Sequence, residues 1–176
     1  MKYFIGVDPS LRNTGVAIFE GDDLVKVFSI NTSPKDSEIV RRRFIFNQFL
    51  ELFNSLKEEG VILCIEDQFI PRFFGAKSSL QVAVVRGLIE SAYMLVFGEN
   101  EIYELMPRQA KAFFLKGKKI PKGKTKQYLM EEIKKFFPKM KFKNMDITDA
   151  VAVGLCGSRL YYQGLLDKNK IANLKT

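Results

Sequence analysis

The chain contains no histidine in its 176 residues and only two cysteines, Cys64 and Cys156. The lack of histidine excludes zinc sites built on histidine, Ser-His-Asp and Cys-His catalysis, and a histidine general base. The cysteines lie in apolar segments without the spacing of a metal motif, so we expect buried free thiols in a reducing compartment, which indicates a cytoplasmic protein. Any acid–base or metal chemistry must therefore use Asp, Glu, Lys or Tyr.

Repeats and linkers are also lacking, and no apolar run approaches the length of a membrane span, so we expect no membrane partner. The N-terminal residues lead directly into a strand that is followed early by Asp8, which is not the pattern of a signal peptide. We therefore expect one domain over residues 1–176, with a polar tail from about residue 164.

The basic residues are concentrated in one segment. Between Pro107 and Lys143 there are thirteen basic and two acidic residues, a net charge of +11, which leaves −3 for the rest of a chain whose total is +8. Such a segment is typical of a polyanion-binding surface. We interpret Lys134, Lys135 and Lys139 as solvated surface, and the Lys116–Lys126 loop as functional.

Four carboxylates stand at positions that one metal site could use. Asp8 and Glu66 each end an apolar run that is typical of a buried strand, and Asp146 and Asp149 are three apart at the start of an apolar helix. Each alone has an ordinary explanation: a turn before proline for Asp8, a salt bridge for Glu66, and a helix N-cap for the other two. Gathered together, they would need a cation to offset their repulsion, and oxygen ligands of this kind favour Mg²⁺, with Mn²⁺ as the alternative.

The apolar patterning predicts an α/β fold with a mixed five-stranded sheet and helices on both faces. We expect strands at Lys2–Val7, Gly15–Glu20, Asp23–Asn31, Val61–Glu66 and Glu101–Leu105. We expect helices at Ser37–Glu59, Ser78–Phe97, Pro107–Leu115, Lys124–Phe137 and Ile147–Tyr162. If the first and fourth strands pair, Asp8 and Glu66 become neighbours at the edge where such sheets bind ligands.

Two helices lead to more detailed expectations. Ser37 is predicted to cap the first helix and Gly60 to end it. Its core-facing residues are predicted to be Ile39, Val40, Phe44, Phe46, Phe49, Leu50, Phe53 and Leu56. The helix Ser78–Phe97 has more apolar surface than one sheet needs, with Leu80, Val84, Leu88 and Ala92 along it; an interior helix is the ordinary explanation.

Several short motifs, taken in order, resemble the RuvC family of Holliday junction resolvases over roughly residues 1–160. Each motif is weak alone, but the ordered set is specific. The motifs are Gly6-Val7-Asp8-Pro9-Ser10-Leu11-Arg12-Asn13-Thr14-Gly15, Glu66-Asp67-Gln68-Phe69, Arg86-Gly87, Arg108-Gln109-Ala110-Lys111, Gly123-Lys124 and Asp146-Ile147-Thr148-Asp149-Ala150. The chain departs from the family in having Ser10 where glycine is frequent, and a longer loop at Ile70–Gly75.

The resemblance implies a ribonuclease H-like fold and a metal-dependent endonuclease that resolves four-way DNA junctions by paired symmetric nicks during recombination and repair. It implies a homodimer, with part of the helix Ser78–Phe97 at its interface, and a branch-migration helicase complex as a further partner. Two Mg²⁺ ions would be held by the four carboxylates. The catalytic residues implied are Asp8, Glu66, Asp146, Asp149 and Lys124.

We also expect a DNA-binding set drawn from the aromatic loop and the basic segment. Exposed aromatic rings beside arginine can stack on unpaired bases, although packing into the core is as good an explanation for Phe73. Lys124 opens a helix behind a glycine, where phosphate contact is favoured. The expected set is Phe69, Arg72, Phe73, Arg108, Lys111, Lys118, Lys122 and Lys124.

Three other functions would each explain part of the sequence. A single-site ribonuclease H-like nuclease, as in the similar YqgF family, would make nicks that are not paired. An actin-like phosphotransferase has a loosely similar opening loop but needs two such domains, for which 176 residues are too few. A junction-binding protein without catalysis would not need the intact carboxylate set.

Overall fold

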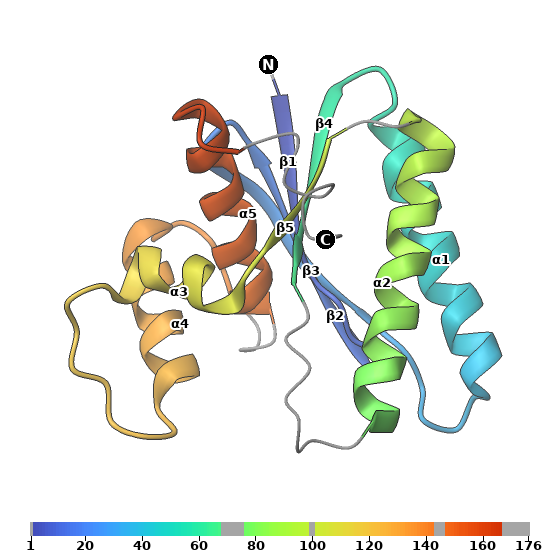
Figure 1. Cartoon of the computed structure of the whole chain (residues 1–176), viewed down its shortest axis with the longest axis horizontal. Helices are drawn as coiled ribbons and strands as arrows, with labels where there is room; N and C mark the ends of the chain where they lie inside the picture. Colours follow the sequence, from blue (N-terminus) through green and yellow to red (C-terminus); the bar gives the residue numbers. More distant parts are fainter. Residues whose placement is uncertain (1, 68–75, 99–100, 143–146, 167–176) are drawn as a thin grey trace, which may run out of the picture.

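The computed structural model describes residues 2–67, 76–98, 101–142 and 147–166. A five-stranded sheet of order β3-β2-β1-β4-β5 has helices on both faces (Figure 1), which confirms the predicted α/β class. The strands are β1 (Lys2–Asp8), β2 (Asn13–Glu20), β3 (Asp23–Asn31), β4 (Gly60–Glu66) and β5 (Ile102–Leu105). The helices are α1 (Glu38–Ser55), α2 (Ala76–Phe97), α3 (Pro107–Leu115), α4 (Thr125–Phe136) and α5 (Ile147–Tyr162).

The centre of the sheet is the β1–β4 pair, which is parallel, whereas β1–β2 and β2–β3 are antiparallel. Both central strands are continuous apolar runs, because each is covered on both faces. Val7 pairs with Ile65, so the next residues along, Asp8 and Glu66, leave the sheet side by side. The predicted neighbourhood of these two carboxylates is confirmed.

Helices α1 and α2 cover one face of the sheet (Figure 1). Their buried residues follow a spacing of about four, which places Ile45, Phe49 and Phe53 of α1 against Ile89 and Tyr93 of α2 in one core. The Tyr93 hydroxyl donates a hydrogen bond to the Val61 carbonyl oxygen at 2.7 Å, which satisfies this buried polar group.

Helix α5 covers the other face, with α3 and α4 packed outside it (Figure 1). Every residue of α5 from Ile147 to Ser158 is buried, which explains its nearly uniform apolar and small composition. Gly6 and Gly154 allow α5 to approach β1 closely: a Cβ atom on Gly6 would overlap the Ala150 carbonyl oxygen and the Gly154 backbone. This close approach fixes the first turn of α5 beside the end of β1.

Some expectations for α1 are wrong. Ile39, Val40 and Phe44 are exposed, Ile39 to 76%, because Ile45, Phe49 and Phe53 form the inward face and the other three point elsewhere. Ser37 is the N-cap residue, as predicted, although its side chain makes no capping hydrogen bond. The predicted end at Gly60 is wrong, because the helix ends at Ser55 and Gly60 belongs to β4. The inward position in the first turn is used by Arg41, which donates hydrogen bonds to Thr32 Oγ1 and to the Leu11 carbonyl oxygen.

Helix α2 has an unusually apolar surface. By length and composition alone, the stretch Lys77–Phe97 could cross a membrane, so the expectation that no apolar run approaches the length of a membrane span is wrong. Only 22% of its most apolar window is buried inside the molecule. The helix ends at Gly98, whose φ of +71° favours glycine. Ala92 is fully buried, so it is not part of the exposed apolar surface that was expected to include it.

Candidate metal centre

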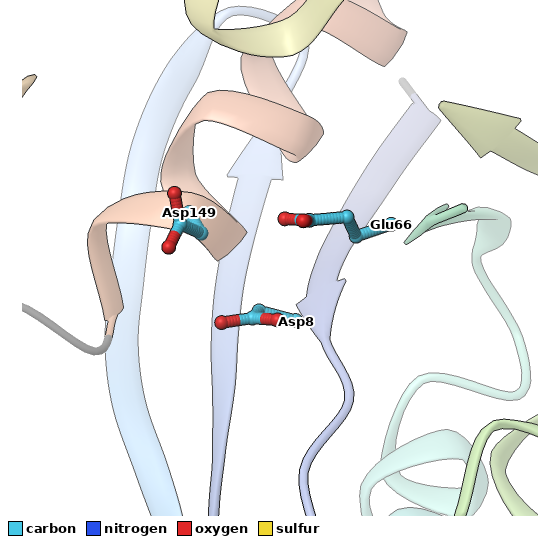
Figure 2. Close-up of side chains that lie close together, drawn as sticks. All are labelled: Asp8, Glu66 and Asp149. Carbon is cyan, nitrogen blue, oxygen red and sulfur yellow. The ribbon is translucent and has the colours of Figure 1, made fainter. Parts of the chain in front are cut away.

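Three of the four predicted carboxylates come together at one edge of the sheet. Asp8 ends β1, Glu66 ends β4 and Asp149 lies in the first turn of α5. One oxygen from each side chain lies within 4.8 Å of the others, and Figure 2 shows the three carboxylates converging on one space. Asp146, the fourth predicted ligand, lies outside the described residues, so its place in the cluster stays a prediction.

Burial and mutual repulsion disfavour the ionised form of the carboxylates in this cluster. Burial is the main cause that raises the pKa of Asp8 to about 8, and the carboxylates of Glu66 and Asp149 raise it further. Burial is likewise the main cause that raises the pKa of Glu66 to about 7. Glu66 Oε2 is buried without a hydrogen-bond partner among the residues that the structure describes. An oxygen of this kind fits a metal ligand, because a bound cation would satisfy it.

Two lysines supply positive charge from the basic segment. Lys111 Nζ on α3 lies 3.0 Å from Asp149 Oδ1, and Lys126 Nζ on α4 lies 3.4 Å from Asp149 Oδ2. Burial lowers the pKa of Lys111, but the nearby Asp149 and Glu66 carboxylates more than offset this, so the net shift is upward and the lysine is charged. The site therefore combines three oxygen ligands with two ammonium groups on one side.

This constellation can be compared with known proteins. A family model described as crossover junction endodeoxyribonuclease RuvC matches residues 4–157. The chain belongs to this family. A RuvC crossover junction endodeoxyribonuclease of Aliarcobacter butzleri (strain RM4018) is 31% identical, with 86% of this chain and 94% of the relative covered. The family and the enzyme class expected from the motifs are confirmed.

Solved structures confirm the fold of RuvC. The Thermus thermophilus RuvC structure in complex with a Holliday junction substrate matches with a TM-score of 0.76 and 17% identity, over 94% of this chain and 98% of that one. A second Thermus thermophilus RuvC structure matches with a TM-score of 0.72 and 18% identity, over 93% and 97%. The yeast mitochondrial Holliday junction resolvase Ydc2 matches with a TM-score of 0.56 and 13% identity, over 90% and 78%.

The lysine that contacts the cluster in this RuvC chain differs from the one expected. Lys124 is the exposed N-cap residue of α4, and no ion pair joins it to the described part of the chain. Lys126 is the lysine that sequence reasoning missed. A signal was present: Lys126 precedes the buried residues Met130 and Ile133 by four and seven positions, so its ammonium group can reach the cluster from that side of α4, although its side chain is 54% exposed.

The structure describes four of the seven other residues predicted to contact DNA. Arg108 and Lys122 are exposed. Lys118 Nζ lies 3.0 Å from the carboxylate of Glu132, and Glu132 also pairs with Lys135. Lys111 contacts Asp149 of the carboxylate cluster. Three predicted residues, Phe69, Arg72 and Phe73, lie outside the described residues. Their roles stay predictions.

Proposed function

We propose that this chain is a divalent-metal endonuclease that resolves four-way DNA junctions by paired symmetric nicks, in the cytoplasm, as part of recombination and repair. The observation that carries the proposal is the convergence of Asp8, Glu66 and Asp149 in a chain of the RuvC family. The structural relative from Thermus thermophilus was solved with a Holliday junction substrate, which supports the same substrate here.

The carboxylates are assigned by their positions. Asp8 at the end of β1, Glu66 at the end of β4 and Asp149 in the first turn of α5, together with Asp146, would hold two Mg²⁺ ions. When bound, divalent cations lower the pKa of a water molecule and stabilise the charge on the leaving oxygen. Such cations would take the place of a histidine base, which this chain lacks.

Lys111 and Lys126 act on the phosphate in this proposal. Their ammonium groups lie 3.0 and 3.4 Å from Asp149. Positive charge at this place would attract the scissile phosphate and stabilise the charge that develops on it. The exposed Lys122 and Lys124, which lie two residues apart just before α4, would contact the DNA backbone.

Paired nicks require two active sites, and helix α2 supplies a surface for a homodimer. A line of apolar and small residues that are exposed or half-buried runs along the helix, and we call it the α2 stripe. The stripe consists of Leu80, Ala83, Val84, Gly87, Ser91, Met94 and Leu95. Contact between two copies of this stripe would be isologous, and small residues at its centre allow close approach.

A plasmid with an extruded cruciform tests the proposal with Mg²⁺ or Mn²⁺ present. Paired nicks across the junction convert the plasmid to a linear form, whereas independent single nicks give open circles. We expect linear product from the wild type. Asp8→Asn should give none while still retarding a labelled junction in a gel, and Asp36→Asn, an exposed carboxylate elsewhere, should cleave normally. Open circles alone would instead indicate the single-site nuclease, and absence of any cleavage would overturn the assignment.

A further inference from the structure

A half-buried arginine that contacts the residue after Glu66 has no part in the chemistry described so far. Arg86 lies in the middle of α2 with its side chain only 15% exposed. Its guanidinium contacts carboxylates from three segments: Asp67 after β4 (Nη1 to Oδ1, 3.3 Å), Glu90 on α2 (Nε to Oε1, 2.7 Å) and Glu104 on β5 (Nη2 to Oε1). One planar group thus joins a helix to the ends of two strands.

The contact with Asp67 reaches the metal centre through one peptide bond. Asp67 directly follows Glu66, and its backbone N–H donates a hydrogen bond to the Leu105 carbonyl oxygen at 2.8 Å. The backbone hydrogen bond and the ion pair to Arg86 both hold Asp67 at the end of β4. Together they fix the backbone from which the Glu66 side chain reaches the cluster.

The charge balance shows why the arginine matters at this point. Asp67, Glu90 and Glu104 gather around one cation, so without Arg86 three carboxylates would repel one another at close range. Asp67 is the member that can move most easily, because it lies just beyond the end of β4 whereas the other two lie inside α2 and β5. Its displacement would shift Glu66 as well.

We propose that Arg86 is a positioning residue for the metal centre, acting through Asp67 to hold Glu66 in the place where it binds a cation. This inference rests on the proposed function, because it assumes that Glu66 is a metal ligand. It also links α2, the helix of the proposed dimer surface, to the catalytic edge of the sheet. A planar fork with several donors suits this task better than a lysine, which offers a single point charge.

Direct binding of Mn²⁺, followed by the electron paramagnetic resonance signal of the free ion, tests the proposal without reference to cleavage. For Arg86→Gln we expect Mn²⁺ affinity to fall about ten-fold or more, as is usual when a partner of a metal ligand is lost. Simple electrostatics predicts the opposite sign, because removing a positive charge near the site should tighten cation binding. The direction of the change therefore separates positioning from long-range charge.

Two further variants complete the test. Arg42→Gln breaks a comparable arginine–glutamate pair, with Glu38 on α1, and should leave Mn²⁺ binding unchanged. Because Arg86 is proposed to act through Asp67, the double variant Arg86→Gln with Asp67→Asn should bind Mn²⁺ no more weakly than Arg86→Gln alone. If Arg86→Gln does not fold, Arg86→Lys keeps the charge but loses the fork, and should weaken binding several-fold.

The outcomes separate this proposal from the one on which it rests. Wild-type protein that binds Mn²⁺ at a site lost in Asp8→Asn supports the metal centre. Unchanged or tighter binding by Arg86→Gln, or unchanged binding by Arg86→Lys where the glutamine variant fails to fold, overturns the role of Arg86 alone. If the wild type binds no Mn²⁺, the metal centre fails and the role of Arg86 fails with it.

Discussion

At the scale of single residues, the three converging carboxylates lower the stability of the folded chain, because burial and mutual repulsion oppose their negative charge. The sequence was sufficient to predict Asp8 and Glu66, because each ends a continuous apolar strand. It was not sufficient to choose Lys126 over Lys124, because both lie in the same basic segment. The choice depends on where α4 begins and which lysine can reach the cluster, and in the structure it is the Lys126 Nζ atom that lies 3.4 Å from Asp149, while the rest of the side chain is largely exposed.

The electrostatic conflict at Asp8 predicts a more stable protein when its charge is removed. The folded state raises the pKa of Asp8 from 3.8 to about 8, so its ionisation costs stability increasingly as the pH rises through this range. In EDTA at pH 8.5, Asp8→Asn should unfold at a higher temperature than the wild type, by at least about 1 kcal/mol or roughly 2–4 °C. Differential scanning calorimetry measures the difference, which should shrink as the pH is lowered toward 5.5.

Two controls define that result. Asp36→Asn removes an exposed carboxylate and should not change the melting temperature in EDTA. Added Mg²⁺ should stabilise the wild type and not Asp8→Asn, because a ligand stabilises only the folded state that binds it. A variant that melts below the wild type in EDTA at pH 8.5 would contradict the picture of an unfavourable carboxylate cluster.

The lysine at the cluster leads to a second residue-scale prediction. Lys126→Ala should lower the single-turnover rate of junction cleavage by about 10²-fold, in the range found when one donor to a developing charge is removed. Lys124→Ala, two residues away and exposed, should change the rate at saturating enzyme by less than about three-fold. Equal losses in the two variants would mean that general charge, and not the contact of Lys126 with the cluster, decides the rate.

At the scale of elements, periodicity placed every helix and strand, but it did not identify the inward side of α1. Ile39 and Phe44 are as apolar as Ile45 and Phe49, and only the packing of α1 against the sheet decides which pair is buried. The helix ends were predicted best where a backbone constraint marks them, as at Pro107, the first residue of α3, and at Gly98 after α2. Ser37 has no comparable constraint, and its hydroxyl makes no capping bond.

The loop between α3 and α4, residues 116–124, extends from the body of the molecule on the side of α4 (Figure 1). Lys122 and Lys124 are exposed there, and no ion pair with another described residue occupies either of them. Lys118, in contrast, is already paired with Glu132. The loop lysines with free charge are therefore the best candidates for phosphate contact.

Salt dependence measures that contact. The double variant Lys122→Ala with Lys124→Ala should flatten the slope of log affinity against log salt concentration for a four-way junction by up to roughly 2, because each lost phosphate contact removes about one released counterion. Lys134→Ala with Lys139→Ala removes the same charge from exposed positions near the other end of α4, and should leave the slope nearly unchanged. Equal slopes for the two double variants would show that the loop lysines are ordinary solvated surface.

At the scale of the whole molecule, the pairing of β1 with β4 brings residues 58 positions apart into one metal centre. The order of strands and helices left this pairing as a condition, although a strand that follows a helical crossover tends to lie parallel to its neighbour, and the structure shows that the two strands pair in parallel. The network around Arg86 could not be predicted in the same way. Its members come from three separate segments, and no local pattern relates Asp67 to Glu104 before the chain is folded.

In the proposed homodimer, the α2 stripe would hold two such centres together. Leu95 in the stripe is 70% exposed, and a glutamate there would place two unpaired charges in a symmetric interface. We expect Leu95→Glu to sediment as a monomer at micromolar concentration and to convert a cruciform plasmid to open circles at most, while the wild type sediments as a dimer and gives linear product. Val25→Glu changes an apolar residue of β3 that is 51% exposed and lies outside the stripe, so it should remain dimeric. Because Leu95 makes no contact with the carboxylate cluster, Mn²⁺ affinity should be the same in all three proteins. A wild type that is monomeric both alone and on a junction would contradict the dimer and, with it, the pairing of the nicks.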